Sequence, residues 1–404
     1  MPHPALSRHF TLLLIIAVML LAANLRAPII AVGPLAGLIQ QDLRISSTVM
    51  GMIAALPVLT FALCSPFAAR LGRRFGMEEV LIGALAVLAG GILLRTAGAS
   101  LWWMLAGTVM LSAGIAMGNV LLSGIIKRSL PDKVGRVTTL YSLAMGVSAG
   151  VAGAAALPLA EVSNWQTALN VWLLPVSAAL AVWLYMRRRN GHITTPAAAG
   201  AVRVSVWRSP LAWAISLLMG LQSLLFYTLA AWLPLMMAAK GVAAAQTGYY
   251  LLVFQLAGLP AVFTTTALAA KLDKAHHRWL MLAICLINAV SILALWRLSD
   301  GLLFWAGLAG FGASSIFTFC LLLFVARTDT AEEAAGLSGM AQSVGYLVAA
   351  LGPVGAGWLF DLTQSWQWPM AVLFALMVVK LLLGWHCARP LTLSQAQAAR
   401  AEKG

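Results

Sequence analysis

Residues 157–166 read LPLAEVSNWQ, and residues 357–367 read GWLFDLTQSWQ. In each segment an acid, Glu161 or Asp361, precedes a Trp-Gln pair by four or five residues. The two segments lie about 200 residues apart, which is half of the 404-residue chain. A repeat with this period predicts that the protein is built from two related halves.

The similarity between the halves extends beyond these two segments. Thr48 and Gly51 stand near the start of one apolar segment, as Thr247 and Gly248 do near the start of another. Glycines also recur in the apolar residues before each acid, at Gly146, Gly150 and Gly153 and again at Gly345, Gly352 and Gly355. Because small residues let membrane helices approach closely, we expect tight helix contacts in both halves.

The composition indicates an integral membrane protein. Hydrophobic residues make up 61% of the chain and charged residues only 9%, whereas a soluble chain carries about 25% charged residues. The mean hydropathy of +0.91 is also far too high for a disordered chain. The sequence carries no nucleotide-binding loop, metal-ligand cluster or nucleophile–base motif. We therefore predict that the protein is not an enzyme and uses no cofactor or metal.

Apolar segments long enough to cross a bilayer as helices recur along the whole chain. We place them at 10–38, 47–69, 79–97, 101–126, 137–159, 166–186, 209–238, 245–270, 279–296, 301–326, 336–360 and 367–387. Strands of a membrane barrel would be about half as long and would alternate in polarity. The sequence therefore predicts an all-α fold of twelve transmembrane helices, arranged as two parallel six-helix repeats.

The longest hydrophilic connection predicts the division between the halves. It spans 187–208 and begins with three consecutive arginines. We expect an N-terminal six-helix bundle at 1–186, a cytoplasmic linker at 187–208 and a C-terminal six-helix bundle at 209–404.

The formal net charge of +14 reflects membrane topology. With both termini in the cytoplasm, 20 of the 26 Lys and Arg residues lie on the cytoplasmic side, and Arg26 and Lys380 fall inside apolar segments. Only four basic residues fall on the outer side: Arg44, Arg95, Lys240 and Arg297. This asymmetry follows the positive-inside rule and removes the reason to expect nucleic-acid binding. We expect a monomer that crosses a bacterial inner membrane repeatedly, with both termini cytoplasmic.

The loop after the second apolar segment resembles a known family motif. It reads ARLGRRFGME at residues 69–78 and resembles the loop motif of major facilitator transporters, Gly-x-x-x-Asp-Arg-x-Gly-Arg-Arg. This copy keeps the glycine and the arginines but lacks the Asp. The resemblance implies that Arg70, Arg73 and Arg74 brace the two halves at the cytoplasmic gate.

Longer segments resemble one branch of that family. They are GNVLLSGIIKR at 118–128, YSLAMG at 141–146, WRSPLAW at 207–213, LSGMAQSVGYL at 337–347, and Asn24-Leu25-Arg26 followed by Gly33-Pro34-Leu35. Together they resemble the cyanate permease branch and in particular its 2-nitroimidazole exporters. The resemblance covers nearly the whole chain and implies a secondary transporter whose partner is a small-molecule solute. The solute stays open, because the branch includes both an anion permease and exporters of neutral heterocycles.

Arg26 is the sharpest candidate for solute binding, because a charge in the middle of an apolar segment is costly. A central Arg opposes membrane insertion by about 2.5–3.5 kcal/mol, and no acid lies at a similar depth in any segment. One hypothesis is that its guanidinium binds a small anion, or a nitro or carbonyl oxygen. The other is that it bonds backbone carbonyls of a helix broken near Pro28.

Further candidates come from the resemblance, which implies that the first, fourth, seventh and tenth helices line the cavity. They are Asn119, Gln222 and Tyr227. Gln342 and Tyr346 are four residues apart and share a helix face, so they complete a polar patch with Arg26 or bond a neighbouring helix. We expect Asn24 to bond another helix, and Lys380 to reach the membrane surface along its long side chain.

The energy coupling is open from the sequence. No Asp, Glu or His stands near the middle of an apolar segment, although proton symporters usually carry one. Three transport modes remain open. They are efflux or facilitated passage of a neutral solute, export of an anion along the membrane potential, and proton coupling through Glu161 or Asp361. The alternatives to an exporter are proton-coupled uptake of cyanate, and a transporter-like fold that acts as a sensor or channel.

Overall fold

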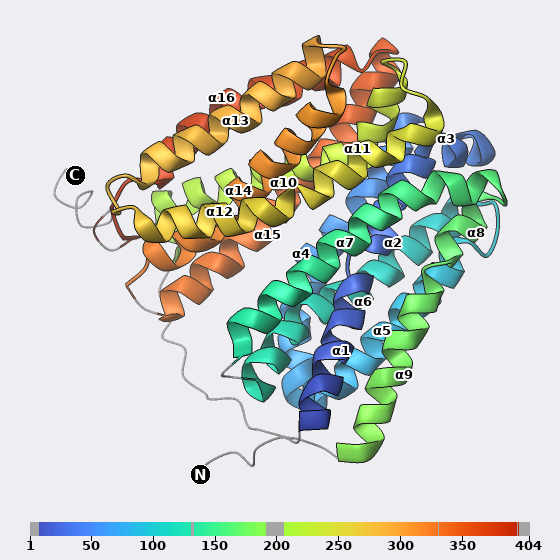
Figure 1. The fold of residues 1–404 in the computed structure, drawn as a ribbon, viewed down its shortest axis with the longest axis horizontal. Helices are drawn as coiled ribbons and strands as arrows, with labels where there is room; N and C mark the ends of the chain where they lie inside the picture. The colour runs from blue at the N-terminus through green and yellow to red at the C-terminus, as the bar shows by residue number, and fades with distance from the viewer. Residues whose placement is uncertain (1–7, 131–132, 191–205, 330, 394, 396–404) are drawn as a thin grey trace.

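The computed structural model describes residues 8–130, 133–190, 206–329, 331–393 and 395 (Figure 1). The first half contains α1 (Arg8–Asn24), α2 (Ala27–Ile30), α3 (Val32–Leu43), α4 (Ser47–Phe75), α5 (Met77–Arg95), α6 (Leu101–Ser129), α7 (Val134–Glu161), α8 (Trp165–Asn170) and α9 (Leu173–Asn190). The second half contains η2 (Val206–Arg208), α10 (Pro210–Ala238), α11 (Ala244–Leu256), α12 (Gly258–Lys271), α13 (His277–Arg297), α14 (Leu302–Ala326), α15 (Ala331–Thr363) and α16 (Gln367–Cys387).

Twelve of the helical segments in these ranges are long and apolar enough to cross a membrane, which confirms the predicted number. Lipid offers no hydrogen-bond partner to a bare backbone, so a membrane segment must satisfy its own peptide groups as a helix. Polar residues between the apolar segments cap the helix N-termini. Ser46 accepts a bond from the Val49 backbone N–H at 3.3 Å, and Asn164 accepts one from that of Thr167 at 2.7 Å.

The segment expected as the linker is partly helical. Helix α9 continues to Asn190, so the three arginines that open the segment belong to the last turn of a helix. Residues 191–205 lie outside the described ranges, and η2 and Pro210 then lead into α10.

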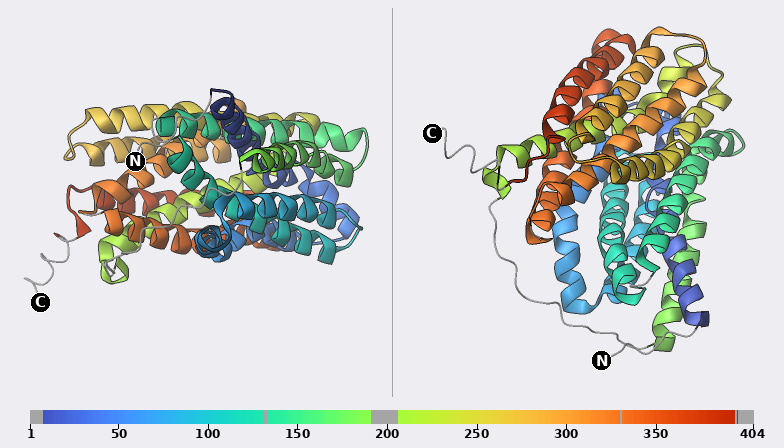
Figure 2. Two further views of the ribbon diagram at one scale, coloured as in Figure 1. Left: turned by 90° about the horizontal axis from the view of Figure 1, so that it is seen from below. Right: turned by 60° about the vertical axis from the view of Figure 1, so that its left-hand side comes forward.

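The helices form two bundles, α1–α9 and α10–α16, which lie side by side in Figure 1 and in the right view of Figure 2. We call the end where α1 begins and α9 finishes the termini end, and the end where α3 and α15 finish the far end. The bundles meet near the far end and diverge toward the termini end (Figure 1). Across the interface α4 packs against α15, α7 against α11, and α10 against α3.

At the far end, Asp361 of α15 binds the first turn of α4. Its Oδ1 accepts a hydrogen bond from the Ser47 backbone N–H at 2.9 Å, and its Oδ2 accepts bonds from the Thr48 N–H and Oγ1 at 2.7 and 2.5 Å. The helices approach so closely that a Cβ at Gly357 would lie 2.2 Å from the Ser47 carbonyl oxygen. A carboxylate at a helix N-terminus also complements the helix dipole, so this contact joins α15 to α4 across the two bundles at the far end.

Candidate functional site

The first membrane segment is broken where Arg26 stands. Helix α1 ends at Asn24, and Arg26 adopts φ −129° and ψ −37° before α2 begins. Pro28 explains the break, because it cannot donate a backbone bond to the carbonyl four residues earlier and its ring crowds that turn. The Asn24 amide donates to the Leu20 carbonyl oxygen at 2.7 Å and to that of Pro175 in α9 at 3.0 Å. The prediction that Asn24 bonds another helix is confirmed.

Arg26 is half-buried and lies among aromatic side chains of the other half. Its guanidinium carbon is 5.1 Å from the centre of the Phe226 ring. Tyr227 of α10 and Tyr346 of α15 both lie within electrostatic range of Arg26. Phe61 of α4 packs edge-on against Tyr346 with the ring centres 6.2 Å apart. In the described part of the chain, Arg26 has no carboxylate partner.

This group, which we call the Arg26 site, can bind a solute by two kinds of contact. The guanidinium offers planar hydrogen-bond donors to an anion or a nitro group, and the phenol hydroxyls can donate or accept beside it. The aromatic faces suit a flat ring. Of the predicted binding residues, the structure thus brings Arg26, Tyr227 and Tyr346 together.

Asn119 and Gln342 have other surroundings. Asn119 is exposed on α6, and Gln342 is exposed on α15, where its amide donates to Ser338 Oγ in its own helix at 3.0 Å. In the described part of the chain, neither is hydrogen-bonded to Arg26. Their part in binding stays a prediction.

Gln222 lies inside the second half and is 1% exposed. Its Nε2 donates to the Ala313 carbonyl oxygen at 2.6 Å, and its Oε1 accepts from Lys380 Nζ at 3.1 Å. Lys380 also donates to Asn288 Oδ1 at 2.5 Å. Both ends of the Gln222 amide are therefore engaged in what we call the Lys380 cluster: Lys380, Gln222 and Asn288.

The expectation that Lys380 reaches the membrane surface is wrong, because its side chain is fully buried. Helix α16 turns this face toward α10 and α13, where two amide oxygens accept from the ammonium. Arg95, which the sequence analysis counted on the outer side, is buried. It ends α5 with 1% of its surface exposed, and its Nη1 donates to the Pro28 carbonyl oxygen at 2.8 Å.

The side chains of Arg70 and Arg73 lie outside the described residues. Arg74 is exposed, and its guanidinium carbon lies 5.1 Å from the ring centre of its neighbour Phe75. Among the described residues, it is the Asp361 carboxylate at the far end that joins the two halves by hydrogen bonds. The role of the three arginines as a gate at the termini end stays a prediction.

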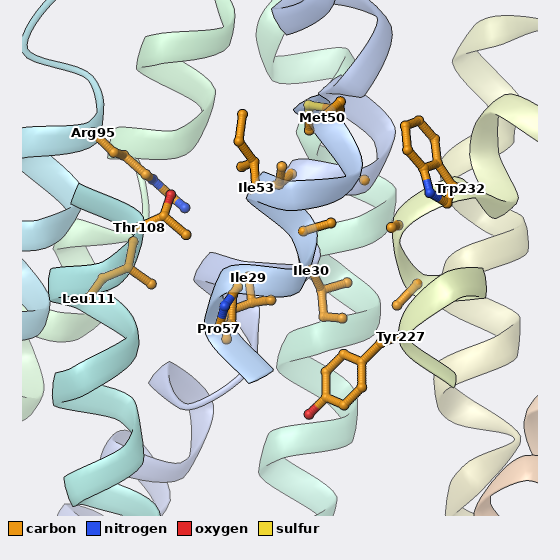
Figure 3. Close-up of a pocket in the computed structure, with 15 residues that line it drawn as sticks. Ile29, Ile30, Met50, Ile53, Pro57, Arg95, Thr108, Leu111, Tyr227 and Trp232 are labelled. Carbon is orange, nitrogen blue, oxygen red and sulfur yellow. The ribbon is translucent and has the colours of Figure 1, made fainter. Parts of the chain in front are cut away.

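A cavity of about 30 Å³ lies between the halves beside the Arg26 site (Figure 3). It has room for one or two water molecules. Tyr227 and Trp232 of α10 close one side, and Ile53 of α4 and Thr108 of α6 line the other. Arg95 also points into this cavity (Figure 3). The sequence analysis counted Arg95 among the basic residues of the outer side, and the structure adds that its side chain lines an interior cavity.

Residues 12–275 match the family model described as Major Facilitator Superfamily. The chain belongs to this superfamily. It is 36% identical to the uncharacterized transporter YycB of Bacillus subtilis (strain 168), over 99% of each chain. It is also 36% identical to a 2-nitroimidazole transporter of Escherichia coli (strain K12), over 93% of this chain and 96% of that one. The cyanate transport protein CynX of the same organism is 26% identical, over 91% and 96%.

Solved structures show the same fold at low sequence identity. A bacterial homolog of the human lysosomal transporter Spinster, in an inward-facing and occupied conformation, matches with a TM-score of 0.78 and 15% identity, over 95% of this chain and 97% of that one. A D-xylose–proton symporter matches with a TM-score of 0.73 and 12% identity, over 95% and 98%.

The family and fold predictions are therefore confirmed: the protein is a multi-pass bacterial membrane protein of a transporter superfamily, built on the major facilitator fold. It is a small-solute transporter.

Proposed function

We propose that the protein exports a small, flat, polar solute of the 2-nitroimidazole type by alternating access, and that the solute binds at the Arg26 site. The observation that carries this proposal is the half-buried Arg26 guanidinium at a helix break, beside Phe226 and two tyrosines. A nitro group presents two coplanar oxygens to such a guanidinium, and a heterocycle can stack on the Phe226 face. The relative named as a 2-nitroimidazole transporter supports this solute class.

The second candidate is uptake of a small anion such as cyanate. It is favoured by the positive charge of Arg26, which has no carboxylate partner among the described residues, and by the similarity to the cyanate transport protein CynX. Drawing an anion into a cell with a negative interior costs about 2.3 kcal/mol per 100 mV, so uptake needs coupling, for instance to protons. Glu161 and Asp361 stay the proposed coupling acids.

In this proposal the termini end faces the cytoplasm of a bacterial inner membrane, and a monomer carries out transport. The basic side chains that the sequence analysis placed on the cytoplasmic side support the orientation. With the far end closed by Asp361 and the bundles apart at the termini end, solute reaches Arg26 from the cytoplasm. Rocking of one bundle against the other then exposes the site to the far side.

Transport by purified protein in proteoliposomes tests the function. Labelled 2-nitroimidazole and labelled cyanate are compared, with and without a pH gradient, for wild type, Arg26→Gln and the exposed control Arg297→Gln. We expect saturable transport of one solute that shows counterflow, at least tenfold slower in Arg26→Gln and unchanged in the control. Flux that does not saturate would indicate a channel. Wild-type transport that survives in folded Arg26→Gln would overturn the role of Arg26.

A further inference from the structure

Arg95 is a buried cation that forms no ion pair with any acid in the described part of the chain. Its Nη1 bonds the Pro28 carbonyl oxygen, but its Nε and Nη2 are buried with no hydrogen-bond partner. Among the described residues that line the cavity, none is an acid. A guanidinium removed from water in this way is costly unless an opposite charge or acceptor meets it.

Thr108 is the second unpartnered group of the same cavity. Five other threonines in the described membrane helices donate their hydroxyl to the carbonyl oxygen four residues earlier: Thr60, Thr228, Thr264, Thr318 and Thr363. Thr108 is 4% exposed, and its Oγ1 has no partner. Thr108 and Arg95 both line the cavity (Figure 3), and no hydrogen bond joins the Thr108 hydroxyl to the guanidinium.

The packing of α5 against α6 sets these two groups side by side. Gly107 precedes Thr108, and a Cβ there would lie 2.2 Å from the Arg95 backbone nitrogen. Glycine lets the helices meet closely enough for the end of α5 to direct Arg95 toward α6. The cavity therefore combines a desolvated cation, a free hydroxyl and space for a few atoms, which is the chemistry that binds a small anion.

We propose that Arg95 and Thr108 form a second binding site, which takes a small monovalent anion of about one to three heavy atoms. The guanidinium Nε and Nη2 and the Thr108 hydroxyl donate to the anion. The chloride of the medium and a small transported anion share this chemistry. The inference that the transported solute occupies this site rests on the proposed function, whereas the inference that the site binds an anion does not.

The site is connected to Arg26 through the backbone. Arg95 bonds the carbonyl oxygen of Pro28, two residues after Arg26, and Ile29 and Ile30 of the same short helix line the cavity. Tyr227 lies at the cavity and within electrostatic range of Arg26. An anion held at Arg95 therefore stabilises the broken segment in the arrangement that positions Arg26.

Thermal unfolding of the purified full-length protein tests the site without any transport. The melting temperature is followed as chloride or cyanate replaces gluconate, an anion too large for the cavity, at constant ionic strength. A ligand that binds only the folded state raises the melting temperature with its concentration. We expect a saturable rise for wild type. A half-saturating concentration of cyanate at least tenfold below that of chloride would identify a transported anion as the occupant, and equal values would identify the anion of the medium.

Variants test whether the rise in melting temperature comes from anion binding at Arg95 and Thr108. Loss of one hydrogen bond to a charged ligand should raise the half-saturating concentration in Thr108→Val at least tenfold, and Arg95→Gln should abolish the response. Ser112→Ala is the matched control, because it removes a hydroxyl one turn away on α6 that bonds its own helix. If Arg95→Gln does not fold, the comparison of Thr108→Val with Ser112→Ala decides.

Arg26→Gln separates this inference from the proposed function. It should keep the anion response while transport slows at least tenfold. The inference is overturned if wild type shows no response beyond that in gluconate, if Thr108→Val responds like Ser112→Ala, or if only Arg26→Gln removes the response. The last outcome would leave the proposed function standing.

Discussion

Removing the charge of Asp361 should open the far end of the transporter. In wild type this carboxylate accepts from two backbone N–H groups and one hydroxyl at the start of α4. Asp361→Asn keeps one acceptor oxygen but loses the second oxygen and the charge. Hydrogen bonds to charged groups contribute about 1.5–3 kcal/mol each, and the partial charge of a helix end contributes up to about 1 kcal/mol.

We expect the substitution to destabilise the state closed at the far end by about 2 kcal/mol, which changes the ratio of the two states roughly 30-fold. If about 1% of wild-type molecules are open at the far end, a minor population of ordinary size, about a quarter of the variant should be. The expected shift comes from weakening the three hydrogen bonds to one side chain.

Distances between two spin labels at the far end measure this population. Gln41→Cys and Ser299→Cys place one label on each half at exposed positions, and Cys64→Ala removes the half-buried native thiol. The matched control is Glu161→Gln, because Glu161 is the repeat-related acid but is exposed and has no such bond among the described residues. An Asp361→Asn distance distribution like that of wild type, or an equal shift in Glu161→Gln, would refute the reasoning.

Two further predictions concern buried groups. Lys380→Met should lower the melting temperature, since it leaves the oxygens of Gln222 and Asn288 without a buried donor at a cost of about 1–3 kcal/mol each. Replacing all three residues of the Lys380 cluster with apolar ones should restore much of the stability, and a triple variant less stable than Lys380→Met would contradict this. Gly357→Val should prevent far-end closure, because its Cβ would overlap the Ser47 carbonyl. The same spin labels should then report an open far end, and a wild-type distance would exclude the predicted clash.

Much of the fold was predictable because each membrane helix corresponds to one apolar segment of the sequence. Lipid requires long apolar helices, so the number of membrane segments can be counted from the sequence, and the repeated acid and Trp-Gln pair indicates two halves. The repeat did not predict that its two acids differ. Asp361 bonds α4 across the halves, whereas Glu161 is exposed, because the distance between helices is a property of their packing.

The site was predictable only in part. Arg26 was recognisable from the sequence because it is a charged residue in the middle of an apolar segment. The structure brings Tyr227 and Tyr346 to it. Gln222 shares α10 with Tyr227 but points into its own bundle. An unpartnered hydroxyl such as that of Thr108 leaves no trace in the sequence, because most helix hydroxyls bond their own backbone.

The sequence by itself determined the membrane class, the twelve segments, the two halves and the central arginine, since each follows from the cost of placing polar groups in lipid. Only the tertiary structure decided where Lys380 and Arg95 point. Sequence position gives the depth of a residue along a segment but not the face that its helix turns toward a neighbour. Lys380 meets two amide oxygens and Arg95 meets a cavity because of how α16 and α5 are rotated and packed.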